Sequence, residues 1–336
     1  MFRFSMQAFR CLAAAVLGLA TICAANAQQP PAEDGAVIHT FPGDLVYPES
    51  VAVDPALGRF FVGSVKHGTL FRGELGKDTM EVISPEGADG REMATGVFFA
   101  NGRLAVVGRQ TGKMFIYDVT ADKPKLLASF HNGLTGPENT FLNDVTFAPD
   151  GSAFVTDSVN PVLYRMVPDG ANKYRLEEYV HWNVQQLGWV RAPGAPGINF
   201  NGVVVTPDGK YLIFSKRNDS SLYRFEIATK EIIKVQLPDK AVFTQDGLFI
   251  DGRTVYAAQN TPQSVSILDF APDYASAVKR GEITHPSFRF PTSVAKIRDR
   301  LIVVSAQFDT KGSPAAVSGG TPPKQPFWAT ELPAPK

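Results

Sequence analysis

Short apolar runs alternate with turns rich in Gly, Asp, Asn and Pro along most of the chain. The clearest example lies between residues 201 and 227. There, two apolar runs flank the turn Pro207-Asp208-Gly209, and a third run follows. Short β-branched and aromatic runs that are bounded by such turns predict strands joined in a meander. The pattern therefore predicts an all-β protein.

The same succession of features recurs six times. The six copies begin at Glu49, Thr95, Asn143, Asn201, Asp246 and Thr292, which lie 46, 48, 58, 45 and 46 residues apart. We call these six the lead residues. A repeat of roughly 40–50 residues with about four strands is typical of a β-propeller blade. The sequence therefore predicts a six-bladed β-propeller over residues 36–309.

The two ends of this region carry further predictions. The alternating segment 36–41 predicts a strand that pairs with the last blade and closes the ring, as in other closed propellers. Residues 272–280 suggest a short helix between the last two blades. Residues 310–336 are rich in Pro, Gly, Ser and Ala, and this composition predicts a flexible tail, which Phe327 and Trp328 could tether to the propeller.

The first 27 residues are typical of a signal peptide. Arg3 and Arg10 precede an apolar stretch, and Ala25-Asn26-Ala27 matches a small-residue cleavage site. Residues 28–35 predict a disordered lead-in. The only two cysteines, Cys11 and Cys23, fall in the leader, so we expect a periplasmic or secreted protein without disulfides. A lipid anchor at Cys23 is the less favoured alternative, because Ile22 is large for the residue before such a site.

The balance of basic and acidic residues argues against two classes of binding partner. The chain has 33 basic and 33 acidic residues, and removal of the leader leaves 31 against 33. A nearly neutral balance gives no support for binding of nucleic acid or of a membrane surface. We therefore expect neither nucleic acid nor a membrane as a partner. The sequence does not indicate the oligomeric state.

Four lead residues are candidate metal ligands. The first strands of all blades line the axis of a propeller, so their lead residues face one another at one mouth of the channel. Glu49 and Asp246 offer carboxylates, and Asn143 and Asn201 offer amide carbonyls. Such oxygen ligands suit Ca²⁺, although manganese, magnesium or zinc also bind oxygen-rich sites. A water-filled channel that satisfies these groups is the alternative.

The order of these motifs resembles the senescence-marker-protein/gluconolactonase family, the regucalcin-like six-bladed propellers that depend on calcium. The resemblance extends from Ala36 to about Phe308, and it implies that the Glu, two Asn and one Asp of the family's ion site correspond to Glu49, Asn143, Asn201 and Asp246. It also implies hydrolysis of a lactone or related ester, in which the ion polarises the carbonyl group. Asp246 would then be a general base or a nucleophile, or a ligand only.

The chain departs from this family at Phe141. Sugar lactonases of the family carry an arginine two residues before the first Asn, and an apolar ring cannot replace a guanidinium group. We therefore expect a more apolar substrate. The long insertion 181–197 precedes the Asn201 strand and contains Trp182, Trp189 and Arg191. Together with Phe141 these residues are candidates for the substrate pocket. Alternatively, the tryptophans pack on the blade below.

Two classes of function follow from the sequence. The first is a calcium-dependent lactonase or esterase, and the second is a non-catalytic propeller that binds a small ligand or a protein, with a structural ion. The sequence contains no Gly-x-Ser-x-Gly elbow, no phosphate-binding glycine-rich loop and no His-Glu-x-x-His motif. The five histidines, at 39, 67, 131, 181 and 285, do not show the spacing of metal ligands.

Overall fold

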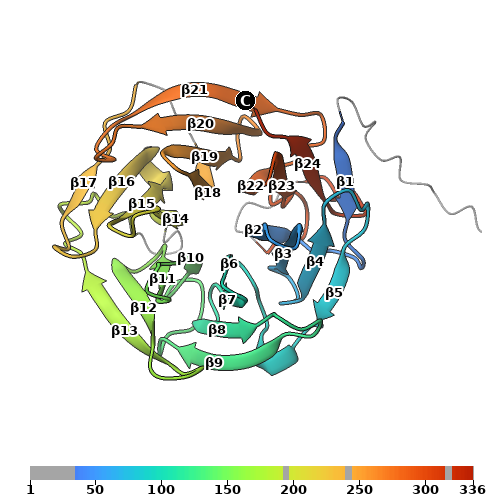
Figure 1. The fold of residues 1–336 in the computed structure, drawn as a ribbon, viewed down its shortest axis with the longest axis horizontal. Coiled ribbons are helices and arrows are strands. Elements are labelled where there is room, and N and C mark those ends of the chain that lie inside the picture. The colour runs from blue at the N-terminus through green and yellow to red at the C-terminus, as the bar shows by residue number, and fades with distance from the viewer. Residues whose placement is uncertain (1–34, 192–196, 239–243, 315–319, 336) are drawn as a thin grey trace, which may run out of the picture.

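The computed structural model describes residues 35–191, 197–238, 244–314 and 320–335. The predicted leader and nearly all of the lead-in lie outside these residues. The described part forms six four-stranded sheets arranged around one axis (Figure 1). The prediction of a six-bladed β-propeller is therefore confirmed. Within the described residues, no helix has the length and apolar character needed to cross a membrane.

Each blade is an antiparallel meander whose first strand lies nearest the axis. Blade one contains β2 (Pro48–Asp54), β3 (Arg59–Ser64), β4 (Leu70–Glu74) and β5 (Glu81–Ser84), and blade two contains β6 (Val97–Ala100), β7 (Arg103–Val107), β8 (Lys113–Asp118) and β9 (Lys125–His131). Blade three contains β10 (Leu142–Phe147), β11 (Ala153–Asp157), β12 (Val162–Pro168) and β13 (Tyr174–His181), and blade four contains β14 (Phe200–Val205), β15 (Tyr211–Lys216), β16 (Ser221–Glu226) and β17 (Ile232–Lys234). Blade five contains β18 (Gln245–Asp251), β19 (Thr254–Gln259), β20 (Ser264–Phe270) and β21 (Ala277–Thr284). Blade six contains β22 (Pro291–Ile297), β23 (Arg300–Ser305), β24 (Trp328–Pro333) and β1 (Val37–Thr40). Two 3-10 turns, η1 (Ala88–Gly90) and η2 (Arg217–Asp219), complete the elements of the described residues.

The inner strands of neighbouring blades approach very closely, and glycines make this possible. A Cβ atom added to Gly202 would lie 2.4 Å from the carbonyl oxygen of Asp246. A Cβ atom added to Gly247 would lie 2.8 Å from the carbonyl oxygen of Thr292. Real Cβ atoms do not make such contacts, so only glycine fits directly after Asn201 and Asp246. The Asn-Gly and Asp-Gly pairs of the repeat therefore allow the lead residues to converge at the axis.

The apolar core lies between adjacent blades. One buried residue follows each lead residue by two positions, and the six are Val51, Val97, Val145, Val203, Leu248 and Val294. They join separate clusters that fill the spaces between sheets. Such burial supplies the main favourable free energy of folding.

Strand β1 closes the ring, as the sequence predicted, but it does so through an unexpected partner. β1 pairs with β24, which in turn pairs with β23. The prediction of a flexible tail is therefore wrong for Trp328–Pro333, where Trp328, Ala329, Thr330, Glu331 and Leu332 are buried. The prolines on either side of this segment concealed one short strand.

The predicted helix at 272–280 is also wrong. Residues Ala277–Thr284 form β21, the outer strand of blade five, and pair with β20. Buried or half-buried residues alternate with more exposed ones along this strand. This alternation is the pattern of a strand with one face packed against the sheet.

A buried polar network joins the two ends of the chain in blade six. His39 Nε2 lies 3.0 Å from Glu331 Oε2, which also accepts a 2.9 Å hydrogen bond from the Gly76 N–H group. Arg300 Nε donates to Glu331 Oε1 over 2.7 Å. Burial alone would raise the pKa of Glu331, but these three donors hold it below its usual range. The network therefore favours an ionised carboxylate at the seam of the ring.

We predict that Glu331→Ala destabilises the propeller by roughly 3–5 kcal/mol, because it removes one member of a buried charged network. Urea unfolding at neutral pH measures this loss. Glu74→Ala is the control, since Glu74 forms an exposed pair with Lys77, and we expect it to cost less than about 1 kcal/mol. Equal effects of the two substitutions would contradict a special role for Glu331.

The same network predicts a dependence on pH. The pKa of Glu331 is lowered in the folded protein, so its stabilising contribution is complete above about 4.3, the ordinary pKa of glutamate. The contribution is lost as the pH falls below this value through the lowered pKa. The difference in unfolding free energy between the wild type and Glu331→Ala should therefore shrink at acidic pH. A difference that stays constant down to pH values of about 3 would contradict this assignment.

Candidate functional site

The structure brings the candidate ligands together as buried side chains. Glu49, Asn143, Asn201 and Asp246 are 6%, 2%, 2% and 3% exposed. The charge of Asp246 raises the pKa of Glu49 through space, and the Asn201 amide lies close enough to Asp246 to oppose the rise in its pKa. Side chains from blades one, four and five therefore meet, and Asn143 of blade three lies beside Asp144, whose charge also acts on Glu49.

Each of these four residues lies within a β-bulge of its inner strand. The register of the inner strand shifts between Pro48 and Val51, between Leu142 and Val145, between Phe200 and Val203, and between Gln245 and Leu248. Blade six shows the same kind of shift around Thr292, between Pro291 and Ser293, whereas blade two, which leads with Thr95, does not. Bulges turn side chains away from the regular alternation of a strand and are frequent beside active sites. Here they turn the four lead residues out of the ladder.

Hydroxyl groups of the preceding blade hold the backbone of these residues. Thr156 of blade three donates to the carbonyl oxygen of Asn201 over 2.8 Å, and Ser215 of blade four donates to that of Asp246 over 2.9 Å. Thr292 of blade six donates to the carbonyl oxygen of Glu49 over 2.7 Å. These hydroxyl groups cross the boundaries between blades, so the positions of the lead residues depend on closure of the whole ring.

Ser158 determines the orientation of the Asn143 amide. The Ser158 hydroxyl group donates to the Phe200 carbonyl oxygen over 2.6 Å, so its oxygen accepts from Asn143 Nδ2 at 2.9 Å. Asn143 must therefore present its nitrogen to Ser158 and direct its oxygen elsewhere. Among the described residues, neither Asn143 Oδ1 nor Asn201 Oδ1 has a hydrogen-bond partner, although both are buried. Such atoms are costly unless a ligand or water satisfies them.

Asn260 and Arg217 hold the carboxylate of Asp246. Asn260 Nδ2 donates to Asp246 Oδ2 over 2.9 Å and to the Pro291 carbonyl oxygen over 2.8 Å, which fixes the orientation of this amide. An Arg217 nitrogen lies 3.5 Å from the same Asp246 oxygen. Burial raises the pKa of Asp246, while Arg217 and the two amide donors oppose this change. The carboxylate is therefore oriented by fixed partners.

Negative charge accumulates at this mouth. Burial raises the pKa of Glu49 well above its usual value, and Asp246 and Asp144 raise it further. Burial also raises the pKa of Asp144 to about 7, although the N–H groups of Val203 and Val145 bind its two oxygens. Buried carboxylates that repel one another in this way are stabilised by a nearby cation.

The donor set fits a hard divalent cation. Two carboxylates, together with two amide oxygens that lack partners, are ligands that Ca²⁺ prefers. Among the described residues, no group of three or more His, Cys, Asp or Glu side chains is arranged to hold a metal ion. The candidate site does not require such a group, because half of its ligands are amides. Glu49, Asn143, Asn201 and Asp246 are therefore the residues that would hold the ion.

Sequence reasoning missed the residues that support the site. Ser158, Arg217 and Asn260 each follow the second strand of their blade, 15, 16 and 14 residues after the lead residue. In a propeller this position lies next to the head of the inner strand. A search for polar residues at this regular offset would have found all three.

The tryptophans of the insertion pack into the protein core. Trp182 makes edge contacts with Phe200, Phe214 and Phe225, at ring-centroid distances of 5.0 to 6.0 Å. Trp189 packs on Phe200 at 5.4 Å. These contacts favour the interpretation that the tryptophans pack on the blade, in place of a substrate rim. The Pro-rich part of the insertion at 192–196 lies outside the described residues.

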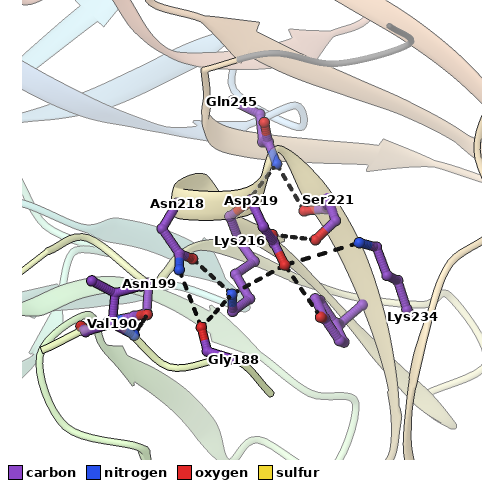
Figure 2. A network of polar contacts seen from close by, with 10 residues as sticks. Gly188, Val190, Asn199, Lys216, Asn218, Asp219, Ser221, Lys234 and Gln245 are labelled. Atoms are coloured by element: carbon purple, nitrogen blue, oxygen red, sulfur yellow. Dashed lines mark hydrogen bonds and ion pairs between the residues drawn. The ribbon is translucent and has the colours of Figure 1, made fainter. Parts of the chain in front are cut away.

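Arg191 and a buried lysine fasten the insertion to its neighbours. Arg191 is exposed and bonds to the carbonyl oxygen of Glu138. Figure 2 shows that Lys216 Nζ lies between the Gly188 carbonyl oxygen at 3.3 Å, Asn218 Oδ1 at 2.7 Å and Asp219 Oδ2 at 3.1 Å. Lys216 is fully buried, so these three acceptors stabilise its charge.

The same network extends to the candidate site. Gln245 Nε2 donates to the carbonyl oxygens of Lys216 at 3.1 Å and Ser221 at 2.7 Å (Figure 2). Gln245 directly precedes Asp246, and Lys216 directly precedes Arg217. The network therefore fixes the backbone from which the side chains of Asp246 and Arg217 extend.

Phe141 does not form a purely apolar wall. The guanidinium group of Arg109 stacks on its ring, 4.2 Å from the centroid. Arg109 comes from blade two, so the sequence around Phe141 could not reveal it. The expectation of an apolar pocket is corrected at this position, because a cationic group covers the ring.

A polar cavity lies beside the Arg109 turn. It has a volume of about 550 Å³, and its lining includes Lys66, Glu92, Gln110, Lys113 and His131. None of the four candidate ligands lines it. The cavity is therefore a separate space between blades one and two and not the candidate ion site.

Comparisons with known proteins support the fold. No family model matches the chain, and no curated protein is significantly similar to it in sequence. Among solved structures, the Malassezia sympodialis allergen Mala s 1 superimposes with a TM-score of 0.65 and 14% identity, over 90% of this chain and 96% of that chain. Luciferin-regenerating enzyme gives a TM-score of 0.58 and 15% identity, over 88% and 95% of the two chains. The calcium-binding protein regucalcin from Agrobacterium tumefaciens gives 0.56 and 16%, over 85% and 90%.

The chain is thus a six-bladed β-propeller that is structurally similar to regucalcin and to luciferin-regenerating enzyme, at low sequence identity. Similarity at this level of identity establishes the architecture. Activity, metal and substrate must be argued from the residues of the site.

We predict that Ser158→Ala weakens Ca²⁺ binding about 10- to 100-fold, the usual effect of losing a residue that orients a metal ligand. Without the Ser158 hydroxyl group, the Asn143 amide can rotate, and its oxygen no longer has a fixed direction. Calorimetric titration of the folded variant with Ca²⁺ measures the loss.

Ser129→Ala is the matched control, because Ser129 is exposed on the outer strand of blade two. It should bind Ca²⁺ like the wild type. Unchanged binding by Ser158→Ala would show that the orientation of Asn143 does not depend on Ser158.

Proposed function

We propose that this protein is an exported, metal-dependent hydrolase of a lactone or related ester, with Ca²⁺ held by Glu49, Asn143, Asn201 and Asp246. One observation carries the proposal. Four buried lead residues converge from four blades, and the amide oxygens of Asn143 and Asn201 lack partners among the described residues. The structural similarity to a calcium-binding propeller and to a propeller enzyme agrees with this proposal.

The bound cation would polarise the ester carbonyl group and stabilise the developing oxyanion. The chain itself supplies the group that accepts a proton. Asp246 takes the proton of the attacking water on its carboxylate. Asn260 and Asn201 hold the carboxylate in place while the proton moves.

Aromatic rings and a cationic group lie together beside the candidate site. The guanidinium group of Arg109 lies 4.2 Å from the ring centroid of Phe141 and 5.8 Å from that of Phe308. A small ester or lactone is the class of substrate that we propose for this mouth.

Export to the periplasm or the exterior, with cleavage near Ala27, completes the proposal. The leader pattern and the absence of cysteine from the mature chain support it. The nearly neutral charge supports a small-molecule substrate in preference to nucleic acid or a membrane surface.

The second candidate is a propeller that binds a ligand without turnover and uses the ion for structure only. One observation favours it. The carboxylate of Asp246 already interacts with Asn260, Asn201 and Arg217, as expected for a group that serves only as a ligand. Enzymatic assays separate the two candidates.

We predict that Asp246→Asn lowers hydrolysis by about 10²- to 10⁴-fold, the usual contribution of a general base. A set of lactones, aryl esters and phosphotriesters with added Ca²⁺, followed by proton release, identifies a substrate and measures this loss. Asp251→Asn is the control, since Asp251 lies at the opposite end of β18 and forms an exposed pair with Lys296. Wild-type turnover by Asp246→Asn would exclude its catalytic role.

We also predict that a chelator abolishes turnover and that added Ca²⁺ restores it, while the strand content seen by circular dichroism stays unchanged. The reason is that the blades close through hydrogen bonds and apolar packing, which do not involve the ion. Full activity in excess chelator would contradict the proposed metal-dependent hydrolysis. Loss of the fold along with the activity would favour a structural ion.

A further inference from the structure

Arg109 extends across the mouth of the channel. It follows β7 in blade two, yet its guanidinium group contacts Phe141 of blade three at 4.2 Å and Phe308, after β23 of blade six, at 5.8 Å. Its charge also acts on Glu49 of blade one and on Asp246 of blade five. Only a position near the axis is close to all of these blades at once. Arg109 therefore lies beside the candidate ion site.

The backbone of Arg109 is held firmly. Its carbonyl oxygen accepts a 3.2 Å hydrogen bond from the Leu142 N–H group, in an isolated bridge to the start of β10. Arg109 adopts a φ of 53°, a left-handed conformation that is uncommon for a residue other than glycine. Strained backbone of this kind is concentrated at functional sites. The bridge pairs Arg109 with Leu142, the residue between Phe141 and Asn143.

The guanidinium group has no hydrogen-bond acceptor among the described residues. Arg109 is only 7% exposed, and the described part of the chain provides no hydrogen bond or ion pair to its side chain. The carboxylates of Glu49 and Asp246 act on it through space only. Aromatic stacking satisfies the faces of the guanidinium plane but leaves its N–H groups unpaired. Its nitrogen atoms are not among the fully buried, partnerless side-chain atoms of the described residues, so they keep access to the channel, where a ligand can accept hydrogen bonds from them.

Charge balance points to the kind of ligand. Glu49 and Asp246 together neutralise one divalent cation, so Arg109 and Arg217 leave the mouth with an excess of positive charge. The remaining carboxylate, Asp144, is engaged by backbone N–H groups of Val203 and Val145. A negatively charged ligand would restore the balance. Arginine is suited to this role because its planar fork binds two oxygens of one carboxylate or phosphate.

We propose that Arg109 is the anion-binding residue of the mouth and that the substrate carries an oxyanion, a carboxylate or a phosphate, near the bond to be hydrolysed. This inference rests on the proposed function and adds the class of substrate. Phe141 and Phe308 present the guanidinium plane, and its unpaired N–H groups bind the oxyanion. The ester carbonyl group then lies toward Asp246.

The test measures binding with ligands that cannot be hydrolysed. The first pair is a six-membered lactam that bears a carboxylate and the same lactam with a carboxamide. The second pair is a hydroxymethyl lactam and its phosphate ester. Calorimetric titration of the mature protein with Ca²⁺ present gives the preference for the charged member of each pair. Comparison of the two pairs distinguishes a carboxylate from a phosphate.

We expect the wild type to bind one charged lactam about 10- to 100-fold more tightly than its neutral partner, as for charge-assisted hydrogen bonds to arginine. Arg109→Gln should lose this preference while it binds the neutral lactam normally. Arg109→Lys keeps the positive charge but not the planar fork, so it should retain part of the preference. This variant also provides the test if Arg109→Gln does not fold. Arg253→Gln, on an exposed turn between β18 and β19, is the control and should behave like the wild type.

Equal binding, or no binding, of the charged and neutral lactams by the wild type overturns the proposal. An undiminished preference in Arg109→Gln, or in Arg109→Lys where the first variant is unfolded, overturns it as well. The outcome is independent of turnover. Hydrolysis of neutral lactones without any charge preference would leave the proposed function in place and remove only the anion site. A charge preference without any hydrolysis would keep the anion site and remove the hydrolase.

Discussion

The close approach of the inner strands around one axis is the constraint on which the rest of the structure depends. At Gly202 and Gly247 the neighbouring blade leaves no room for a side chain. Where a side chain is present at the equivalent position, as in Asp144, it bonds to the backbone of the next blade. Tight packing at this ring brings polar groups from separate blades within reach of one another. The site is therefore a product of blade geometry and does not arise within any single blade.

This convergence of the inner strands brings several carboxylates close together. Neighbouring groups offset part of the repulsion between them. Asn260 and Arg217 stabilise Asp246, while backbone N–H groups stabilise Asp144. Among the described residues, Glu49 has no comparable set of donors, and burial and its acidic neighbours raise its pKa. The incomplete compensation at Glu49 is a reason to expect a cation, since a fully neutralised cluster would gain little from one.

The repeat in the sequence predicted the number of blades, the lead residues and the closing strand, because blade spacing and strand alternation are local patterns. The prediction failed where the deciding contact comes from a distant part of the chain, or where the amino-acid composition of a segment is misleading. Arg109 reaches Phe141 from another blade, so the chemistry around Phe141 was assigned to an aromatic ring alone. Pro333 and its neighbouring prolines concealed β24, whose strand character depends on the edges of β23 and β1. Ser158 and Asn260 follow their lead residues at a regular distance along the sequence. The reason for this spacing becomes clear only from the three-dimensional arrangement of the blade.

Blade six is assembled from both ends of the chain, and this has a consequence for the order of assembly. Each of the first five blades is continuous in sequence, so each can form from a single segment of the chain. Strand β24 lies between β23 and β1 in the sheet, and until it pairs with them β1 and β23 each keep an unpaired edge. Unpaired edges recruit strands from other chains. A partly folded chain in which blade six is still open is therefore the state most exposed to association with its own copies.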